Sequence, residues 1–274
     1  SVLFIIPWAG KWIVGTTDTP YEGDRAEPLA SREDVQYILD QANRVLKPKL
    51  KAEEIIGVYA GLRPLVANNK SATTTKLSRE HTVDRPVAGF VSIAGGKYTT
   101  YRVMAQDVID RAVIELRRLT KESVTEKLPL VGADGYFALE QQKERIAQES
   151  GLDVETVTHL LNRHGSLISE ILEIIDEQPK LAAKLDAELP YIKAEIIYAA
   201  THEGALSVDD VISRRTRLSF EATNHAVYLA EDVAALIAPV LGWSAKERKE
   251  SIAHYVGLVE REKAALDQLL EVNS

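Results

Sequence analysis

The residues best suited to chemistry in this sequence form the run GGKYTTYR at Gly95–Arg102. Its two adjacent glycines let the backbone turn sharply and let another group approach closely. A helical pattern over Tyr101–Leu119 follows, and the first turn of a helix offers unpaired N–H groups that suit an anion. Lys97 adds a positive charge, and Thr99 and Thr100 add hydroxyl groups. The run therefore predicts a site for phosphate or for the polar edge of a cofactor, whereas the alternative is a strand-to-helix turn that threonine caps.

Two arginines add positive charge that suits an anionic ligand. Arg63 directly follows a strand pattern at residues 55–62, and a guanidinium fixed at a strand end suits bidentate capture of a carboxylate or phosphate. Arg79 lies on a second strand pattern at residues 73–80. For each arginine the alternative is an ordinary ion pair with a nearby acid. Convergence of both arginines with Lys97 on one concave face would separate a binding site from solvated charge.

Other polar clusters carry weaker predictions. The cluster Thr16–Asp18 follows a strand pattern and forms, in the simplest interpretation, an Asx turn. Three arginines lie within residues 214–217, where they either stabilise a helix end as exposed cations or form a docking patch for the first domain or a partner. The histidines show no spacing typical of metal ligands, and we expect no metal.

Composition limits the class of protein. The chain has 274 residues, a hydrophobic content of 45%, a net charge of −8 and no cysteine. An acidic chain argues against nucleic acid as the main partner, because phosphate backbones attract basic faces. The lack of cysteine excludes disulfides and thiolate metal sites and fits a cytosolic protein. The sequence has no signal-peptide pattern and no apolar run of transmembrane length, and it leaves a peripheral membrane contact open.

The first third of the chain is predicted to be rich in strands. Apolar runs at Val2–Pro7 and Lys11–Thr17 predict a hairpin. Ser31 has the features of an N-cap, and apolar residues at helical spacing follow it as far as Pro48. The strand that leads into the glycine run is predicted at residues 86–94.

From about residue 124 the pattern becomes helical. Helical segments are predicted at residues 138–150, 154–161, 167–177, 192–203, 207–212, 220–241 and 245–270. Pro and Gly between residues 129 and 135 mark a linker before them. We predict an α+β fold, with a mixed or antiparallel sheet in a domain over residues 1–125 and an all-α helical domain over residues 130–274.

Taken together, these segments resemble the C-terminal half of the FAD-dependent, respiratory-type glycerol-3-phosphate dehydrogenases. The most specific support is GLRPL at Gly61–Leu65 combined with GGKYTTYR at Gly95–Arg102. The segments within Phe4–Tyr21, LSRE at Leu77–Glu80 and DVISRRT at Asp210–Thr216 also match the family pattern. The resemblance extends over nearly the whole chain.

The resemblance implies a reaction and roles for individual residues. Glycerol 3-phosphate would be oxidised to dihydroxyacetone phosphate by hydride transfer from C2 to the flavin of FAD. The electrons would then pass to a membrane quinone or, in some members, to oxygen. Arg63 and Lys97 would be the catalytic residues, because Arg63 would hold the substrate near the flavin and Lys97 would lie between the substrate and the flavin ring. Arg79 would bind the substrate phosphate.

The same resemblance implies a cofactor-binding surface. The residues expected to contact FAD are Gly61, Gly95, Gly96, Lys97, Tyr98 and Thr99. The helix that starts at Thr100 would direct its positive end toward the O2/N1 region of the flavin, where reduced flavin carries negative charge.

The sequence departs from the family in one respect, because it has no Gly-x-Gly-x-x-Gly run for the ADP part of FAD. It also begins at Ser1 directly in a strand pattern. We therefore expect a piece of a longer protein, in which residues 1–125 are the remainder of the FAD- and substrate-binding domain. Alone, this chain would not retain FAD and would be inactive. Unpaired sheet edges would favour a homodimer.

Two other interpretations stay open. The chain would be a non-catalytic interaction module if the glycine turn is purely structural. It would be the substrate half of a related flavin amine or amino-acid oxidase if the bound anion is a carboxylate. For the parent protein we expect a cytoplasmic location, with peripheral contact at the inner face of the cell membrane.

Overall fold

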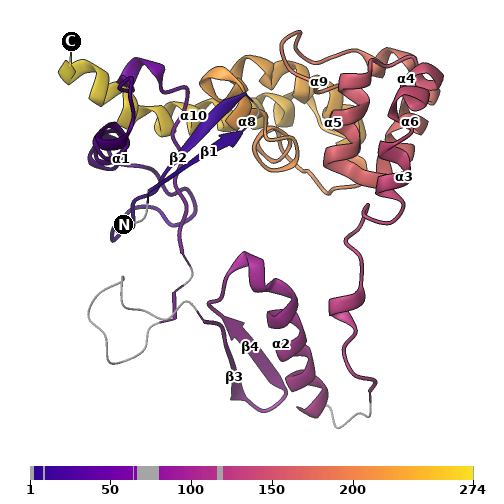
Figure 1. The fold of residues 1–274 in the computed structure, drawn as a ribbon, viewed down its shortest axis with the longest axis horizontal. Coiled ribbons are helices and arrows are strands. Elements are labelled where there is room, and N and C mark those ends of the chain that lie inside the picture. Colours follow the sequence, from indigo (N-terminus) through magenta and orange to yellow (C-terminus); the bar gives the residue numbers. More distant parts are fainter. Residues whose placement is uncertain (1–2, 9, 64, 67–79, 116–119, 274) are drawn as a thin grey trace. The chain divides into compact units, whose positions relative to one another are not determined.

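A computed structural model describes residues 3–8, 10–63, 65–66, 80–115 and 120–273 (Figure 1). Its contacts divide the chain into two compact units. The helical unit comprises Ser1–Thr17, Leu29–Tyr59 and Leu130–Ser274, and the hairpin unit comprises Asp18–Pro28 and Ala60–Pro129.

Helices make up most of the helical unit. They are α1 (Arg32–Val45), α3 (Tyr136–Glu140), α4 (Lys143–Ser150), α5 (Val154–His164), α6 (Ile168–Glu177), α7 (Lys193–Thr201), α8 (Leu218–Glu221), α9 (Ala230–Leu241) and α10 (Ala245–Asn273). Residues Asp210–Arg215 form a π-helical turn, and 3-10 turns lie at Ala52–Glu54, Gly165–Leu167, Pro179–Ala182 and Thr223–Leu229. The helical character predicted after residue 130 is confirmed, but the predicted segments 138–150 and 220–241 are each broken into shorter helices, and the segment predicted at 207–212 is the π-helical turn.

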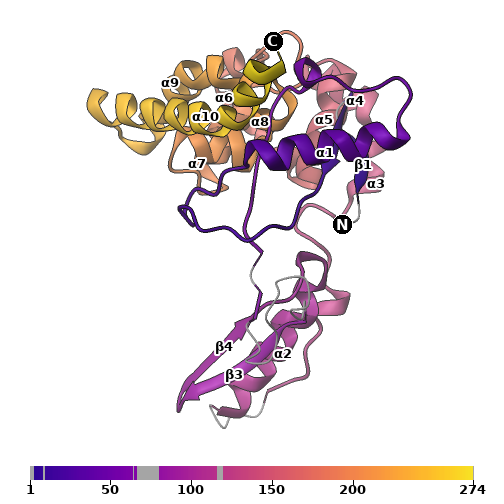
Figure 2. The same cartoon turned by 90° about the vertical axis from the view of Figure 1, so that its left-hand side faces the viewer.

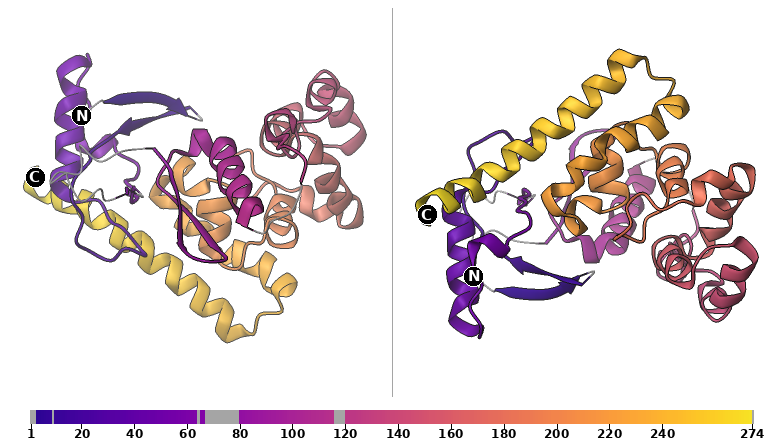
Figure 3. Two further views of the ribbon diagram at one scale, coloured as in Figure 1. Left: turned by 90° about the horizontal axis from the view of Figure 1, so that it is seen from below. Right: turned by 90° about the horizontal axis from the view of Figure 1, so that it is seen from above.

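Two buried clusters hold these helices together. One contains Ile212 from the π-helical turn, Ile237 from α9 and Tyr255 from α10. The other contains Leu160 from α5 and Ile171 from α6, and α4 and α7 also contribute to it. Figure 3 shows α10 as one long helix that runs beside α9. Buried apolar surface therefore accounts for the stability of this unit.

Helix α1 starts where the sequence predicts it. The Ser31 hydroxyl accepts a hydrogen bond from the N–H of Asp34 at 3.1 Å, and the Asp34 carboxylate accepts one from the N–H of Ser31 at 3.3 Å. This capping box satisfies two N–H groups that the helix itself leaves unpaired. Val35 of α1 is buried in a cluster with Leu269 of α10, and Figure 2 shows the C-terminal end of α10 close to α1.

The N-terminal hairpin is also confirmed. Strands β1 (Phe4–Trp8) and β2 (Lys11–Gly15) pair in antiparallel register. Gly10 in the turn has a φ of 74°, a conformation that glycine adopts without steric cost.

The hairpin unit contains a second antiparallel pair, β3 (Thr82–Val87) and β4 (Phe90–Ala94), followed by α2 (Tyr101–Glu115). Its 3-10 turns lie at Tyr98–Thr100 and Thr125–Lys127. The prediction of one strand over residues 86–94 is wrong, because the chain turns back at Ala88 and Gly89, where Gly89 has a φ of 80°. The register of β3 shifts between Asp84 and Val87, around Pro86, which has no N–H to pair.

The strand predicted at residues 55–62 is not present, because this segment has an irregular backbone. It still makes specific contacts in the helical unit, where the Tyr59 ring lies edge-on to Phe220 with centroids 4.9 Å apart. The strand predicted at residues 73–80 lies outside the described residues except for Glu80, which is in a bend.

Both sheets of the described chain are two-stranded and antiparallel, which together with the helices confirms the predicted α+β fold. The boundary predicted between residues 125 and 130 stays a prediction. Contacts group the first hairpin and α1 with the C-terminal helices instead, since α1 packs on α10. Within the described residues, no helix combines the length and the apolar character that crossing a membrane requires.

Candidate functional site

The backbone at Gly95 and Gly96 has a shape that only glycine adopts readily. Their φ angles are 76° and 86°. A Cβ atom at Gly95 would lie 2.8 Å from the carbonyl oxygen of Glu80, and one at Gly96 would lie 2.5 Å from Sδ of Met104. The clash at Gly95 involves backbone, which has little room to move. The sequence therefore has two adjacent glycines here because the turn after β4 is tight and closely packed.

The turn delivers Lys97 to the start of a helix. The N–H of Thr100 donates to the carbonyl of Lys97 at 3.0 Å, and the Thr100 hydroxyl donates to the same oxygen at 3.0 Å. The N–H groups of Tyr98 and Thr99 precede this first helical bond and so have no partner within the helix. The threonine bond stated above as the alternative is present, and the anion site at this helix start stays a prediction.

The side chains around this turn are open to solvent. Tyr98 is 91% exposed, and its ring stacks on Tyr101 with centroids 5.9 Å apart. Lys97 is exposed, and among the described residues no carboxylate pairs with it. The Arg102 guanidinium is already occupied, because it donates hydrogen bonds to the carbonyl oxygens of Thr125 and Leu128. These bonds tie the start of α2 to the last residues of the hairpin unit.

Arg63 has an acidic partner. Its Nη1 pairs with Oδ2 of Asp18, and 39% of the Arg63 side chain is exposed. The prediction that Arg63 is fixed at a strand end is wrong, because the residues before it are irregular. The ion pair with Asp18 holds the guanidinium in place of a strand. The sequence motifs do not predict that Arg63 pairs with Asp18. The polar cluster that contains Asp18 is the feature of the sequence that points to such a partner.

The predicted convergence of three cations stays a prediction. Arg79 lies outside the described residues, and Arg63 and Lys97 belong to the same hairpin unit. Gly61 has a different environment from the glycine pair. A Cβ atom there would meet nothing within 4 Å, so the backbone at Gly61 borders open space.

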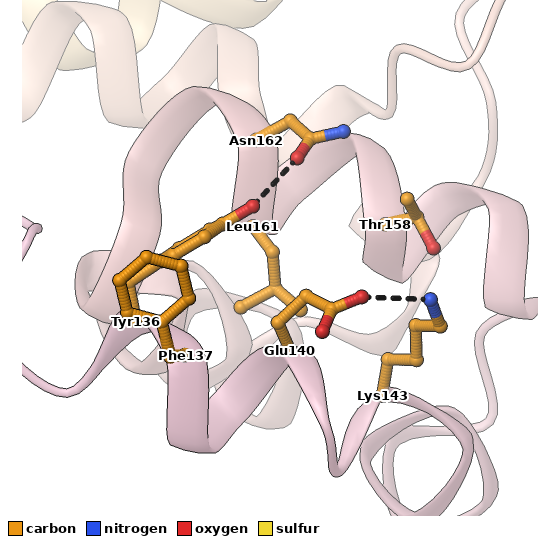
Figure 4. Close-up of a pocket in the computed structure, with 7 residues that line it drawn as sticks. All are labelled: Tyr136, Phe137, Glu140, Lys143, Thr158, Leu161 and Asn162. Carbon is orange, nitrogen blue, oxygen red and sulfur yellow. Dashed lines mark hydrogen bonds and ion pairs between the residues drawn. The ribbon is translucent and has the colours of Figure 1, made fainter.

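A separate hollow in the helical unit contains none of the predicted site residues. Tyr136, Phe137, Glu140, Lys143, Thr158, Leu161 and Asn162 surround about 290 Å³ between α3 and α5 (Figure 4). Its polar groups already pair with each other: the Tyr136 hydroxyl donates to Asn162 at 2.9 Å, and Lys143 pairs with Glu140 at 2.9 Å. We assign no chemistry to this hollow.

The helical unit has one strongly buried charge cluster. Oε1 of Glu195 in α7 lies 2.9 Å from Nε2 of His159 and 3.4 Å from Nε2 of His164, both in α5. Oε2 accepts the N–H of Ile192 at 3.0 Å. Burial alone would raise the pKa of Glu195, but the hydrogen bonds from the two histidines lower it to about 2. The cluster ties α5 to α7.

Two of the arginines at residues 214–217 support different alternatives, one an exposed helix end and the other a docking contact. Arg214 pairs with Asp209 and Asp210, as an exposed helix end would. Arg217 instead lies over the ring of Trp8 in β1, 4.9 Å from its centroid. This contact favours the docking interpretation for Arg217, since a cation over an indole face is attracted to it. No group of acids and histidines in the described chain could hold a metal ion.

Two family models match the chain. The model described as FAD dependent oxidoreductase matches residues 1–102, and the model described as the C-terminal domain of alpha-glycerophosphate oxidase matches residues 123–248. Glycerol-3-phosphate dehydrogenase of Mycobacterium leprae is 50% identical over 262 residues, which are 96% of this chain and 45% of that protein. The chain belongs to the family of FAD-dependent glycerol-3-phosphate dehydrogenases.

Further members of this family are also similar to this chain over most of its length. Mitochondrial glycerol-3-phosphate dehydrogenase of Homo sapiens is 34% identical over 257 residues, which are 92% of this chain and 35% of that protein. The structure of glycerol-3-phosphate dehydrogenase from Bacillus halodurans complexed with FAD has a TM-score of 0.78 and 26% identity. It covers 94% of this chain, which spans 51% of the Bacillus chain. The resemblance stated from sequence is confirmed, and the chain spans between about a third and a half of the length of the relatives that it matches.

Proposed function

We propose that this chain forms the substrate-facing part of an FAD-dependent enzyme that oxidises glycerol 3-phosphate to dihydroxyacetone phosphate. The observation that carries the proposal is the Gly95–Lys97 turn, which leads from β4 directly into a helix start whose first N–H groups have no partner within the helix and whose lysine is exposed. In the reaction the substrate loses a hydride from C2 and the proton of its C2 hydroxyl group. FAD, when bound, supplies the hydride acceptor.

The geometry of the turn fits the edge of a flavin ring. The two glycines allow the tight turn that brings the chain into the helix start, and the N–H groups of Tyr98 and Thr99 have no partner within the helix and would be available to an electron-rich acceptor. A helix start favours negative charge near it. Gly61 adds a stretch of backbone that borders open space. These residues would hold the polar edge of the ring and stabilise negative charge on it.

The substrate would be held by positive charge. Arg63 has donors beyond the one that pairs with Asp18, and Lys97 has no acidic partner among the described residues. We propose that these two cations, with Arg79, bind the anionic substrate and hold its C2 atom at the cofactor.

The proposal extends to the parent protein. Its electron acceptor would be a quinone, reached at the inner face of the cell membrane from a cytoplasmic location, and it would act as a homodimer. This chain alone would be inactive, because its relatives are about twice as long and the sequence lacks the Gly-x-Gly-x-x-Gly run that binds the ADP part of FAD.

A chimera tests the proposal. In the M. leprae relative, the 262 matched residues would be replaced by the corresponding residues of this chain. We expect the purified chimera to be yellow and to reduce a dye acceptor with glycerol 3-phosphate, and we expect the 274-residue chain alone to do neither. Lys97→Ala in the chimera should lower kcat/KM by about 100-fold or more, the scale of losing a charged group that acts on the reacting atoms.

Three results would contradict parts of the proposal. A folded, flavin-loaded chimera that does not oxidise glycerol 3-phosphate would reject the assigned substrate. Oxidation of an amino acid instead would favour the related oxidase. Activity of the 274-residue chain alone would show that it binds the cofactor without the rest of its relatives' length.

A further inference from the structure

An ion pair holds one end of the Arg63 guanidinium group. Its Nη1 pairs with Oδ2 of Asp18, and within the described part of the chain no second acid pairs with Arg63. A guanidinium is planar and presents five N–H donors in a fixed fork. A carboxylate at Nη1 therefore fixes the plane of the group and leaves donors elsewhere on the fork for a second ligand.

Both side chains of the ion pair are partly exposed to solvent. The Asp18 side chain is 23% exposed and that of Arg63 is 39% exposed. The acid is thus the more enclosed partner, and the arginine is the more accessible one. A supporting residue behind a ligand-binding cation has this order of exposure.

Asp18 and Arg63 both belong to the hairpin unit, and Arg63 lies in a segment where the described residues form no strand that could fix it. The long side chain of an arginine loses considerable rotamer freedom when it is ordered, so a partner that orders it beforehand lowers the cost of binding.

We infer that Asp18 is a positioning residue for Arg63, which holds one edge of the guanidinium so that the other donors face the anionic substrate. The inference rests on the proposed function of Arg63 as a substrate ligand. It gives the Thr16–Asp18 cluster a role beyond a local turn.

Two consequences follow from the chemistry of the pair. Without the Asp18 carboxylate, the guanidinium would be free to rotate, and the substrate would be oriented less precisely in the transition state. Without its negative charge, the attraction of Arg63 for anions would be stronger, because that charge now offsets part of the arginine's. Orientation and affinity would therefore change in opposite directions.

Asp18→Asn in the chimera separates these effects, because asparagine keeps the shape and removes the charge. We expect kcat to fall about tenfold from lost orientation. We expect KM for glycerol 3-phosphate and the inhibition constant of inorganic phosphate to fall about threefold, the scale of a half-exposed ion pair. Partial unfolding would lower kcat but leave both of the other constants unchanged.

Asp24→Asn is the matched control. Asp24 is an exposed acid in the same loop, and it accepts the N–H of Ala26 at 2.9 Å. We expect this variant to keep kcat and KM within about twofold of the parent chimera, as surface substitutions do.

A double-mutant cycle tests whether Asp18 acts through Arg63. Arg63→Lys replaces the planar fork by a point charge that a carboxylate cannot orient in the same way. In that background Asp18→Asn should change kcat by less than about twofold. If Asp18→Asn does not fold, Asp18→Glu replaces it: the charge stays and the carboxylate moves, so kcat should fall while phosphate inhibition is unchanged.

The inference would be overturned if Asp18→Asn raised KM, matched the Asp24→Asn control, or lowered kcat equally with Arg63 and with lysine at that position. An unmodified chimera that failed to oxidise glycerol 3-phosphate would instead reject the proposed function. The two failures are therefore distinct.

Discussion

The helical unit buries its apolar side chains, and the hairpin unit does not. Leu160 and Ile237 in the helical unit are fully buried, with no exposed surface. In the hairpin unit no described residue is buried, and Val103, Ile109 and Ile114 of α2 are 54%, 59% and 66% exposed. A two-stranded sheet with one helix is marginally stable on its own in water.

This difference shows that the two units owe their structure to different interactions. The helical unit has its own core. The hairpin unit relies on local geometry, namely strand pairing, the glycine turn and the Arg102 bonds, and it exposes apolar surface of the kind that marks contact with other protein. The site proposed above lies in the unit with the weaker core, so substitutions in the two units should have different effects.

A matched pair of truncations should show the largest contrast. Leu160→Ala in α5 should lower the free energy of unfolding by about 2–5 kcal/mol, because it leaves a cavity in a close-packed core. Ile109→Ala in α2 should lower it by less than about 0.5 kcal/mol, since that side chain is already exposed. Urea unfolding of the 274-residue chain, followed by circular dichroism, measures both. Equal losses would mean that the hairpin unit has a core after all.

Acid should weaken the helical unit through Glu195. Its pKa in the folded chain, about 2, is below the usual 4.5, so it contributes stability above about pH 4.5 that is lost as the pH falls toward 2. The contribution is on the order of 3 kcal/mol. Urea unfolding at several pH values between 7 and 3 should show this loss.

Glu195→Gln should remove that pH dependence and lower stability at pH 7. Glu149→Gln is the control, because Glu149 is exposed and makes a 3.6 Å surface pair with Arg145. If the two variants gave the same pH profile, the buried cluster would not be the source of the acid sensitivity.

In the hairpin unit, stability should depend more on backbone geometry than on the burial of side chains. Gly95→Ala should destabilise the strand pair by about 2 kcal/mol or more, because the residue has a positive φ and its Cβ would meet the Glu80 carbonyl. Gly89→Ala has the same φ problem but no close neighbour and should cost about 1 kcal/mol. Hydrogen exchange of the β3 and β4 amides measures both. A larger cost at Gly89 would contradict the tight packing at Gly95.

A modest effect is expected at the start of α1. Ser31→Ala removes the capping box and should lower stability by about 1 kcal/mol, whereas Ser31→Thr keeps the hydroxyl and should retain most of it. The midpoint of urea unfolding measures the change. An unchanged midpoint for Ser31→Ala would show that α1 is held by its packing on α10 alone.

Local features of the sequence were enough to predict many elements. Ser31 predicts the start of α1 because its hydroxyl can accept a hydrogen bond from an N–H group in the next helical turn, and the apolar runs around Gly10 predict the first hairpin. The turn within residues 86–94 has a local signal too, Gly89, although the apolar residues on both sides of it favour one strand. The irregular backbone at residues 55–62 had none, because an apolar run fits a strand and a packed loop equally well.

The candidate site also combines features that the local sequence predicts with contacts that it does not predict. The sequence by itself determined the glycine turn, the lysine that follows it and the helix start, because these depend on neighbouring residues and on the conformations that glycine allows. Only the tertiary structure decided that Asp18 supports Arg63, that His159 and His164 share Glu195, and which apolar faces are buried. These contacts join residues far apart in the chain, and their energies depend on distance and burial that no local pattern contains.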